Sequence, residues 1–160
     1  IALKSGATLT NFPTNTPAFE AINSGNQSIS NNTQTKVQFQ TENLDTDSCF
    51  DNTTNYRFTP TTAGKYYIYS TLTIENGNNI GHAGMITIRK NGSGVFVSQT
   101  NVWSNTVLNL SSVSASTILT LNGSTDYVEI FGLGENSSGT PDFRGDSAGQ
   151  CIFGGYKILT

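Results

Sequence analysis

Few residues in this sequence could perform acid–base or nucleophilic chemistry. The one histidine, His82, lies in a stretch rich in Gly and Asn, just before an expected strand. Serine is abundant, so a Ser-His-Asp arrangement is formally available, but we expect no nucleophile elbow that would position such a serine. We therefore interpret His82 as an exposed or structural histidine and predict that the protein is not an enzyme.

Carboxylates are the second group of residues that could carry chemistry, and they lie in expected loops. Asp45, Asp47 and Asp51 belong to the run D-T-D-S-C-F-D, and Asp142 and Asp146 lie nearer the C-terminus. A pair of these acids could serve a glycosidase, although nothing in the sequence defines their separation. The first three could instead bind calcium, which takes oxygen ligands from flexible loops. The run lacks the glycine and the terminal Glu of an EF-hand, and the alternative is that its acids are simply solvated.

Sulfur and indole chemistry rest on three residues. The two cysteines, Cys49 and Cys151, are too few for a disulfide scaffold, and their spacing does not match a zinc site. They could pair with each other, since one lies near the early core strands and the other near the C-terminal strand; the alternative is two buried free thiols. The one tryptophan, Trp103, could stack on a sugar or a partner, or it could belong to the core.

Composition excludes several classes of function. The chain has 160 residues, of which 35% are hydrophobic and 12% charged, and its net charge is −3. It has no basic run with interleaved aromatic residues, so we expect no nucleic-acid binding. No apolar run reaches the ~20 residues of a membrane span, so we expect no membrane insertion. The abundance of Asn, Thr, Ser and Gly is typical of extracellular and virion β-proteins.

Strands must position these residues, because no helical periodicity extends beyond one turn. Val37 and Phe39 alternate with polar residues in the expected strand 35–41. Residues 56–70 place two aromatic runs on either side of T-P-T-T-A-G, which we interpret as a hairpin and as the centre of the core. Asn91-Gly92 and Asn122-Gly123 predict tight turns of type I′. Further strands are expected at 17–22, 85–90, 95–100, 125–133 and 150–159.

About ten strands separated by turn signals predict an all-β fold, a two-sheet antiparallel sandwich or jelly roll. Residues 1–16 are small and polar and contain proline, so we interpret them as an N-terminal tail or linker. Residues 17–160 are then one domain, long enough to bury its own core.

Several short patterns resemble the C1q-like (C1q/TNF) jelly-roll domain and occur in the same order. They are Ala18-Phe19-Glu20-Ala21, Lys36-Val37-Gln38-Phe39 with Asn43, the spaced Phe50, Phe58, Gly64 and Tyr66, then Ile88-Arg89-Lys90-Asn91-Gly92, Leu121-Asn122-Gly123 with Asp126-Tyr127-Val128, and Phe153-Gly154-Gly155-Tyr156. Together they cover about residues 17–159. The wording L-N-G-S-T-D-Y-V-E and the turns rich in Asn and Thr are most similar to the heads of phage and aquatic viral proteins.

The resemblance implies a ten-strand jelly roll that assembles as a compact homotrimer and has no catalytic role. It implies a virion-associated head or decoration domain, at a fibre tip or on a capsid surface, that binds other virion proteins and a host-surface receptor or glycan. Aromatic residues would form the core or the trimer interface; the candidates are Phe19, Phe39, Phe58, Tyr66, Phe153 and Tyr156. Some C1q-like trimers hold calcium near the three-fold axis, so calcium stays a candidate cofactor, with no other cofactor expected.

Two other functions stay open. One is a secreted C1q/TNF-like ligand that binds a protein receptor, and the other is a monomeric carbohydrate-binding or hydrolytic sandwich. Both would place the protein outside the cell. For the virion-associated head we expect the recognition surface in the polar loops 42–55, 77–81 and 134–149, while the residues that contact a ligand stay unassigned.

Overall fold

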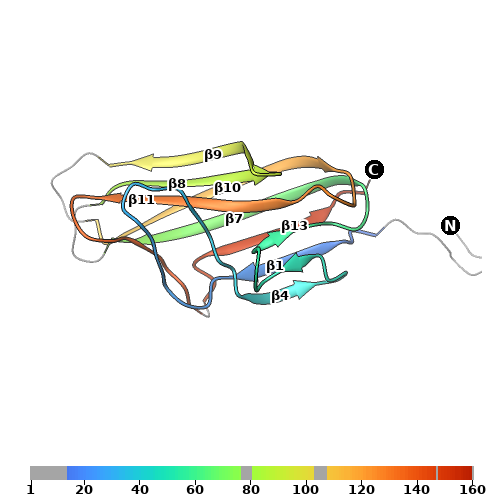
Figure 1. The fold of residues 1–160 in the computed structure, drawn as a ribbon, viewed down its shortest axis with the longest axis horizontal. Coiled ribbons are helices and arrows are strands. Elements are labelled where there is room, and N and C mark those ends of the chain that lie inside the picture. Colours follow the sequence, from blue (N-terminus) through green and yellow to red (C-terminus); the bar gives the residue numbers. More distant parts are fainter. Residues whose placement is uncertain (1–13, 77–80, 103–107, 147, 160) are drawn as a thin grey trace, which may run out of the picture.

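The computed structural model describes residues 14–76, 81–102, 108–146 and 148–159. Within these ranges the chain forms two antiparallel sheets, and it contains no helix. The long strands run along the longest axis of the molecule (Figure 1). Among the residues described, no helix is long and apolar enough to cross a membrane. The predicted all-β, two-sheet antiparallel sandwich is confirmed.

The seven-stranded sheet is built around its longest members. Its strands are β1 (Ala18–Ile22), β2 (Gln27–Ser28), β4 (Thr41–Asp45), β7 (Gly64–Glu75), β10 (Leu110–Leu121), β12 (Asp142–Phe143) and β13 (Ile152–Lys157). On one edge β7 pairs with β10 along its whole length, and on the other it pairs first with β13 and then with β12. The path continues from β13 to β1 and β4, so β10 and β4 lie at opposite edges.

The six-stranded sheet is arranged in a similar way around β11. Its strands are β3 (Thr35–Lys36), β5 (Phe50–Asp51), β6 (Arg57–Phe58), β8 (Gly81–Lys90), β9 (Ser93–Asn101) and β11 (Val128–Asn136). One edge of β11 pairs with β8, which pairs with β9, and the other edge is shared by β3 and β6. The count of thirteen strands exceeds the expected ten because several strands are only two residues long.

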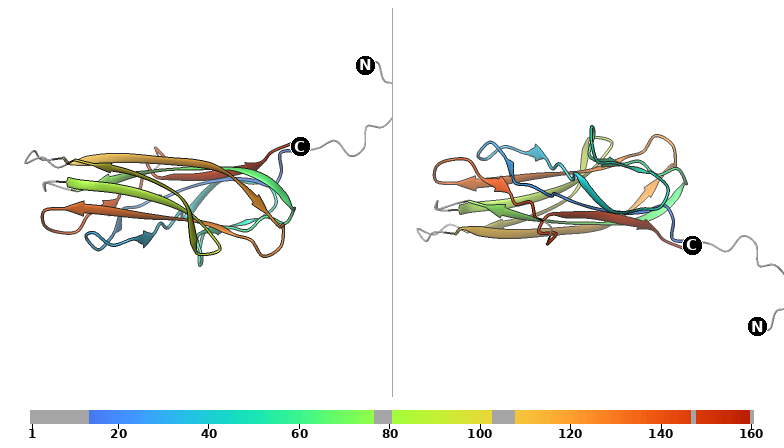
Figure 2. Two further views of the ribbon diagram at one scale, coloured as in Figure 1. Left: turned by 90° about the horizontal axis from the view of Figure 1, so that it is seen from above. Right: turned by 90° about the horizontal axis from the view of Figure 1, so that it is seen from below.

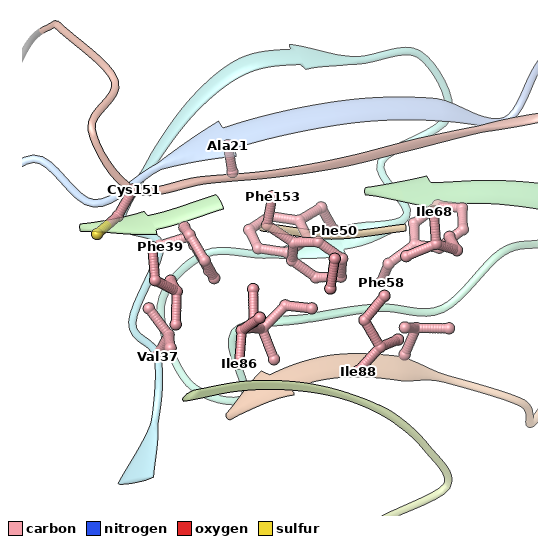
Figure 3. Packing of buried hydrophobic residues seen from close by; sticks show 14 of the residues in the cluster. Ala21, Val37, Phe39, Phe50, Phe58, Ile68, Ile86, Ile88, Cys151 and Phe153 are labelled. Atoms are coloured by element: carbon pink, nitrogen blue, oxygen red, sulfur yellow. The ribbon is translucent and has the colours of Figure 1, made fainter. Parts of the chain in front are cut away.

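Phenylalanine rings from both sheets meet between the layers. Phe19 of β1 lies 4.3 Å from Phe58 of β6 and 5.1 Å from Phe50 of β5, in both cases with nearly parallel rings. Phe153 of β13 meets Phe19 edge-on at 4.8 Å. Figure 3 shows Phe50, Phe58 and Phe153 close together between the layers, with Phe39 beside them. These contacts join the two sheets across the sandwich.

The predicted hairpin at residues 56–70 is wrong. Its first arm is β6, in the six-stranded sheet, and its second arm is the start of β7, in the seven-stranded sheet. The segment T-P-T-T-A-G therefore crosses from one layer to the other. Local turn chemistry could not reveal this crossing, because the two arms pair with other strands and not with each other: β6 pairs with β5 and β11, and β7 with β10, β12 and β13.

The expected strand 35–41 is a second crossing. Only Thr35–Lys36 and the segment from Thr41 onward are strands, and they belong to different sheets. Val37 and Phe39 are nevertheless fully buried, as their alternation predicted, because the segment between the strands passes along the core. The alternation therefore predicted the burial of Val37 and Phe39 correctly. The prediction that residues 35–41 form one strand was wrong.

The two Asn-Gly turns differ. Asn91 and Gly92 have φ of 51° and 81°, and they join β8 to its neighbour β9, so the type I′ hairpin is confirmed. After Asn122 the chain instead leaves β10 for β11 in the other sheet. Here the Asn122 side-chain oxygen accepts from the amides of Ser124, Thr125 and Asp126 and stabilises a connecting loop. The prediction of a second hairpin at this place is wrong.

We expect Phe19→Ala to lower the free energy of unfolding by about 3 to 5 kcal/mol, because the cavity would separate rings that belong to both sheets. The measurement is urea unfolding followed by tyrosine fluorescence and circular dichroism. Leu159→Ala is the control, since Leu159 is 51% exposed and lies beyond the end of β13. Equal losses for the two variants would contradict the assignment of Phe19 to the core.

Candidate functional site

The six aromatic candidates separate into two groups. Five of them are buried in the core, with relative exposure of 2% or less: Phe19, Phe39, Phe58, Tyr66 and Phe153. Tyr156 is 40% exposed and lies on the outer face of the seven-stranded sheet. Only Tyr156 therefore remains available for an interface, and it belongs to a larger aromatic surface.

Three tyrosines cover the middle of that outer face. Tyr67 and Tyr69 alternate with buried residues along β7, and Tyr67 pairs across strands with Tyr156 on one side and Ile118 on the other. The ring centroids of Tyr67 and Tyr156 are 5.6 Å apart, and those of Tyr67 and Tyr69 are 6.1 Å apart. We call this surface the tyrosine face; it comprises Tyr67, Tyr69, Tyr156, Ile118 and, on β4, Leu44.

The sequence Gly154-Gly155 explains how Tyr69 lies on this face. Gly154 is the cross-strand partner of Tyr69, and a Cβ at Gly154 would overlap the Tyr69 ring. With glycine there, the ring lies across β13 and its hydroxyl donates to Glu20 Oε2 of β1 at 2.7 Å. Burial, and then the bond to Glu20, raise the pKa of the Tyr69 phenol, which stays protonated at neutral pH. The face is therefore preorganised rather than free to rearrange.

An uncovered edge strand lies beside the tyrosine face. In β9 no residue is charged and none is proline, and Val95, Phe96 and Val97 are 44%, 40% and 52% exposed. β9 pairs with β8 on one side, and no strand among the described residues pairs with its other side. Exposed apolar edges of this kind pair with other chains unless something covers them. β9 and β10 also lie against each other, at the same side of the sandwich.

A shallow depression of about 350 Å³ connects the edge strand to the tyrosine face. No charged side chain lines it, and most of its polar groups are hydroxyls. Its lining consists of Tyr67, Tyr69, Ser70 and Thr71 of β7, Phe96 and Ser98 of β9, and Ser114, Ala115 and Ser116 of β10. The apolar edge and the tyrosine face are thus parts of one continuous surface. Figure 2 shows the ribbon of the same sandwich from above and from below.

The acids proposed for calcium bind their own loop instead. Asp45 accepts from the amides of Cys49 and Phe50 at 3.0 and 2.9 Å. Asp51 accepts five hydrogen bonds from groups of Thr53, Thr54 and Asn55. Asp47 accepts from the Thr46 hydroxyl at 2.6 Å. The hydrogen bonds that Asp51 accepts, with the one from the Thr54 amide contributing most, hold the pKa of Asp51 well below its usual value.

A calcium ion does not fit this arrangement. The oxygens that would bind it are aimed at amide groups, and in the described part of the chain no three His, Cys, Asp or Glu side chains form a group that could hold a metal. Asp142 accepts from Ser28 and Asp146 from the amide of Ala148. The first of these bonds joins the paired strands β12 and β2, and the second lies within the loop that follows β12.

One stretch does match the G-x-S-x-G pattern, contrary to our expectation. Residues 145–149 are G-D-S-A-G. A nucleophile elbow needs a sharp turn between a strand and a helix, whereas this stretch lies in the connection between two strands, β12 and β13. Ser147 itself lies outside the described residues. His82 is the second residue of β8 and is partly buried.

Cys49 and Cys151 are both buried free thiols, so the pairing that the sequence left open is not made. Their surroundings differ. Cys49 Sγ lies near Asp47 and Thr61, whereas Cys151 Sγ accepts from the amide of Thr73 at 3.4 Å. Burial raises the pKa of the Cys151 thiol to about 11, which leaves it unreactive at neutral pH.

Two sequence predictions lie partly or wholly outside the described residues, namely Trp103 and most of the loop 77–81. The loop 42–55 contains the strands β4 and β5, and the loop 134–149 contains the end of β11 and all of β12. The sequence analysis missed Tyr67, Tyr69, Ile118 and Phe96 as surface residues. The period-two alternation along β7 and β10 indicates which residues face outward, and this signal identifies Tyr67, Tyr69 and Ile118.

Comparisons with known proteins identify the fold and not the family. No protein-family model matches the chain, and no curated protein matches it. Among solved structures it is similar to murine APRIL at pH 5.0, with a TM-score of 0.64 and 12% identity over 88% of this chain and 98% of that one. Murine APRIL at pH 8.5 gives a TM-score of 0.57 and 13% identity over the same shares. The shared architecture is a C1q/TNF-like jelly roll.

We expect Asp51→Ala to destabilise the protein by about 1 kcal/mol at pH 7, the size of a lost capping interaction. The folded-state pKa of Asp51 is depressed, so its contribution is present above its usual pKa of 3.8 and is lost as the pH falls through the lower folded value. The difference between wild type and variant, measured by urea unfolding from pH 7 to pH 2, should therefore shrink toward the acid end.

Asp47→Ala is the control for this series, because Asp47 is exposed and accepts only from its neighbour Thr46. It should change stability little at any pH. A difference between wild type and Asp51→Ala that did not depend on pH would contradict the role given to the carboxylate.

Proposed function

We propose that this domain is a non-enzymatic binding and display module that works as a homotrimer, most simply as a virion-associated head or decoration domain. One observation carries the proposal: the residues that the structure describes in a single copy leave both the tyrosine face and the apolar edge strand β9 uncovered. Exposed apolar patches rimmed by polar residues mark interaction sites. A second copy of this chain is the occupant that best accounts for both.

The two surfaces differ in shape, which favours packing of an edge against a face. The tyrosine face spans the seven-stranded sheet from β10 to β4, whereas β9 is a single edge strand of the other sheet. A contact between unlike surfaces is heterologous, and it forms a closed ring when the rotation permits. The C1q-like pattern in the sequence implies that the ring has three members. Closure would also protect the bare edge of β9 from uncontrolled strand pairing.

The absence of charge supports the same conclusion. The centre of a stable interface is depleted in charged residues and enriched in aromatic ones. The lining of the depression contains no Lys, Arg, Asp or Glu, and the one carboxylate near it, Glu20, is bonded by Tyr69 and by Asn43. The Glu20 carboxylate and the Tyr69 hydroxyl would therefore need no new hydrogen-bond partner when a second copy covers the face.

The virion setting rests on the similarity of the turn sequences to phage and aquatic viral heads. The TNF-like fold equally suits a secreted ligand domain that binds a protein receptor. The depression, with its hydroxyls and aromatic rings, favours a third candidate, a monomeric carbohydrate-binding sandwich. Both candidates based on assembly place the domain on a virion surface or in the extracellular space.

Solution mass, measured by light scattering after size-exclusion chromatography, tests the assembly. We expect about three times the 17.1 kDa of one chain. The double variant Ile118→Glu, Tyr156→Glu should run as a monomer, because it would bury two carboxylates without partners. Leu133→Glu, on the outer face of the other sheet, should stay trimeric.

A folded wild-type monomer would overturn the trimer and direct attention to sugars at the depression. A chelator should leave the mass unchanged, because the loop acids are bonded to amides rather than arranged around a cation. Dissociation by the chelator would instead mean that calcium holds the assembly together.

A further inference from the structure

The outer face of the six-stranded sheet carries a row of charged side chains. Cross-strand pairing places Arg57 of β6 and Arg89 of β8 on either side of Glu129 in β11. Adjacent strands lie about 4.8 Å apart, so the Cα atoms of the two arginines are separated by roughly 10 Å. Both side chains are partly exposed, while Glu129 is buried.

Both guanidinium groups are held on aromatic rings. Arg89 Cζ lies 3.7 Å from the ring centroid of Phe131, and Arg57 Cζ lies 4.3 Å from that of Tyr127. Arg89 also donates to the side chain of Gln34. Stacking orients the plane of a guanidinium and leaves its N–H edge available to a planar anion, which it binds through two parallel hydrogen bonds.

The carboxylates beside this row already have donors. Glu129 Oε2 lies 2.5 Å from Lys36 Nζ. At the end of the row, Asp51 is the cross-strand partner of Arg57, but its oxygens accept from the loop amides described above. Within the described ranges neither Arg57 nor Arg89 forms an ion pair. Among the residues described, the two arginines thus have no carboxylate partner at ion-pair distance.

We propose that Arg57 and Arg89 bind a carboxylated polysaccharide along the outer face of the six-stranded sheet, each arginine holding one carboxylate. A stiff polymer that repeats its carboxylates can reach both arginines at once. An acidic protein fits less well, because protein interfaces rely on aromatic or aliphatic anchors, and the rings of Phe131 and Tyr127 are already covered by guanidinium.

This inference deepens the binding role proposed above by naming the class of ligand, and it rests on that role and not on the trimer. The arginine row lies on the opposite sheet from the tyrosine face. Assembly would use the β9 edge of the six-stranded sheet, whereas the row lies on the outer face of β6, β11 and β8. A trimer would present three copies of it and increase the avidity for a polymer.

The test is titration calorimetry of the full chain with oligogalacturonate at about 0.15 M salt, where surface charges are partly screened. The double variant Arg57→Gln, Arg89→Gln should bind at least about tenfold more weakly, as expected for the loss of hydrogen bonds to charged groups. The pair Arg57→Lys, Arg89→Lys keeps the charge and loses the planar fork, so it should also bind more weakly than wild type.

The matched control is Lys65→Gln, Lys157→Gln, which removes two cations from strands of the other sheet. It should leave the affinity unchanged. An equal loss of affinity in this control would mean that net charge alone explains the binding, and it would overturn the proposal. Absence of binding by the wild type would overturn it as well. Equal binding of poly-glutamate would overturn it in favour of an acidic protein. Light scattering of the same samples reports the oligomeric state independently, so that loss of ligand binding is distinguished from failure to form the trimer.

Discussion

The two sheets are held together by phenylalanine rings that come from both layers, and most other features of the molecule depend on that contact. Phe19 and Phe153 of the seven-stranded sheet interlock with Phe50 and Phe58 of the six-stranded sheet at centroid distances between 4.3 and 5.8 Å. Because side chains alternate along a strand, the rings that point inward decide which residues point outward. Burial of Phe19 in β1, for example, places Glu20 on the outer surface, where it receives Tyr69.

This alternation produces two outer faces of different character. The seven-stranded sheet presents tyrosines and serines, with its one nearby carboxylate already bonded. The six-stranded sheet presents arginines stacked on rings and an ion pair between the partly exposed Lys36 and the buried Glu129. An uncharged aromatic face suits permanent contact with another copy, since covering it costs little desolvation. A face with oriented guanidinium groups suits an anionic ligand that binds and leaves. We propose that assembly and recognition are divided in this way between the sheets.

The polar loops serve a structural purpose. Asp45 and Asn122 each accept several amide hydrogen bonds where the chain passes from one sheet to the other, and Asp51 does the same in the turn that joins β5 to β6 within one sheet. A jelly roll has many such crossings, which accounts for the abundance of Asn, Asp, Ser and Thr. The same residue types first suggested metal or glycosidase chemistry, and the structure shows several of them accepting hydrogen bonds from backbone amides.

The sequence by itself determined the fold class, the position of the Asn91-Gly92 hairpin and the burial of residues such as Val37, Phe39 and Val128, because local φ preference and period-two alternation depend only on near neighbours. It could not decide which strands pair. The segments at residues 35–41 and 56–70 looked like a strand and a hairpin, and both are crossings between sheets. Tertiary structure alone placed Tyr67 beside Tyr156, and Arg57 in one row with Arg89. Hydrogen bonds between strands join residues far apart in the chain, and no local pattern encodes that choice of partner.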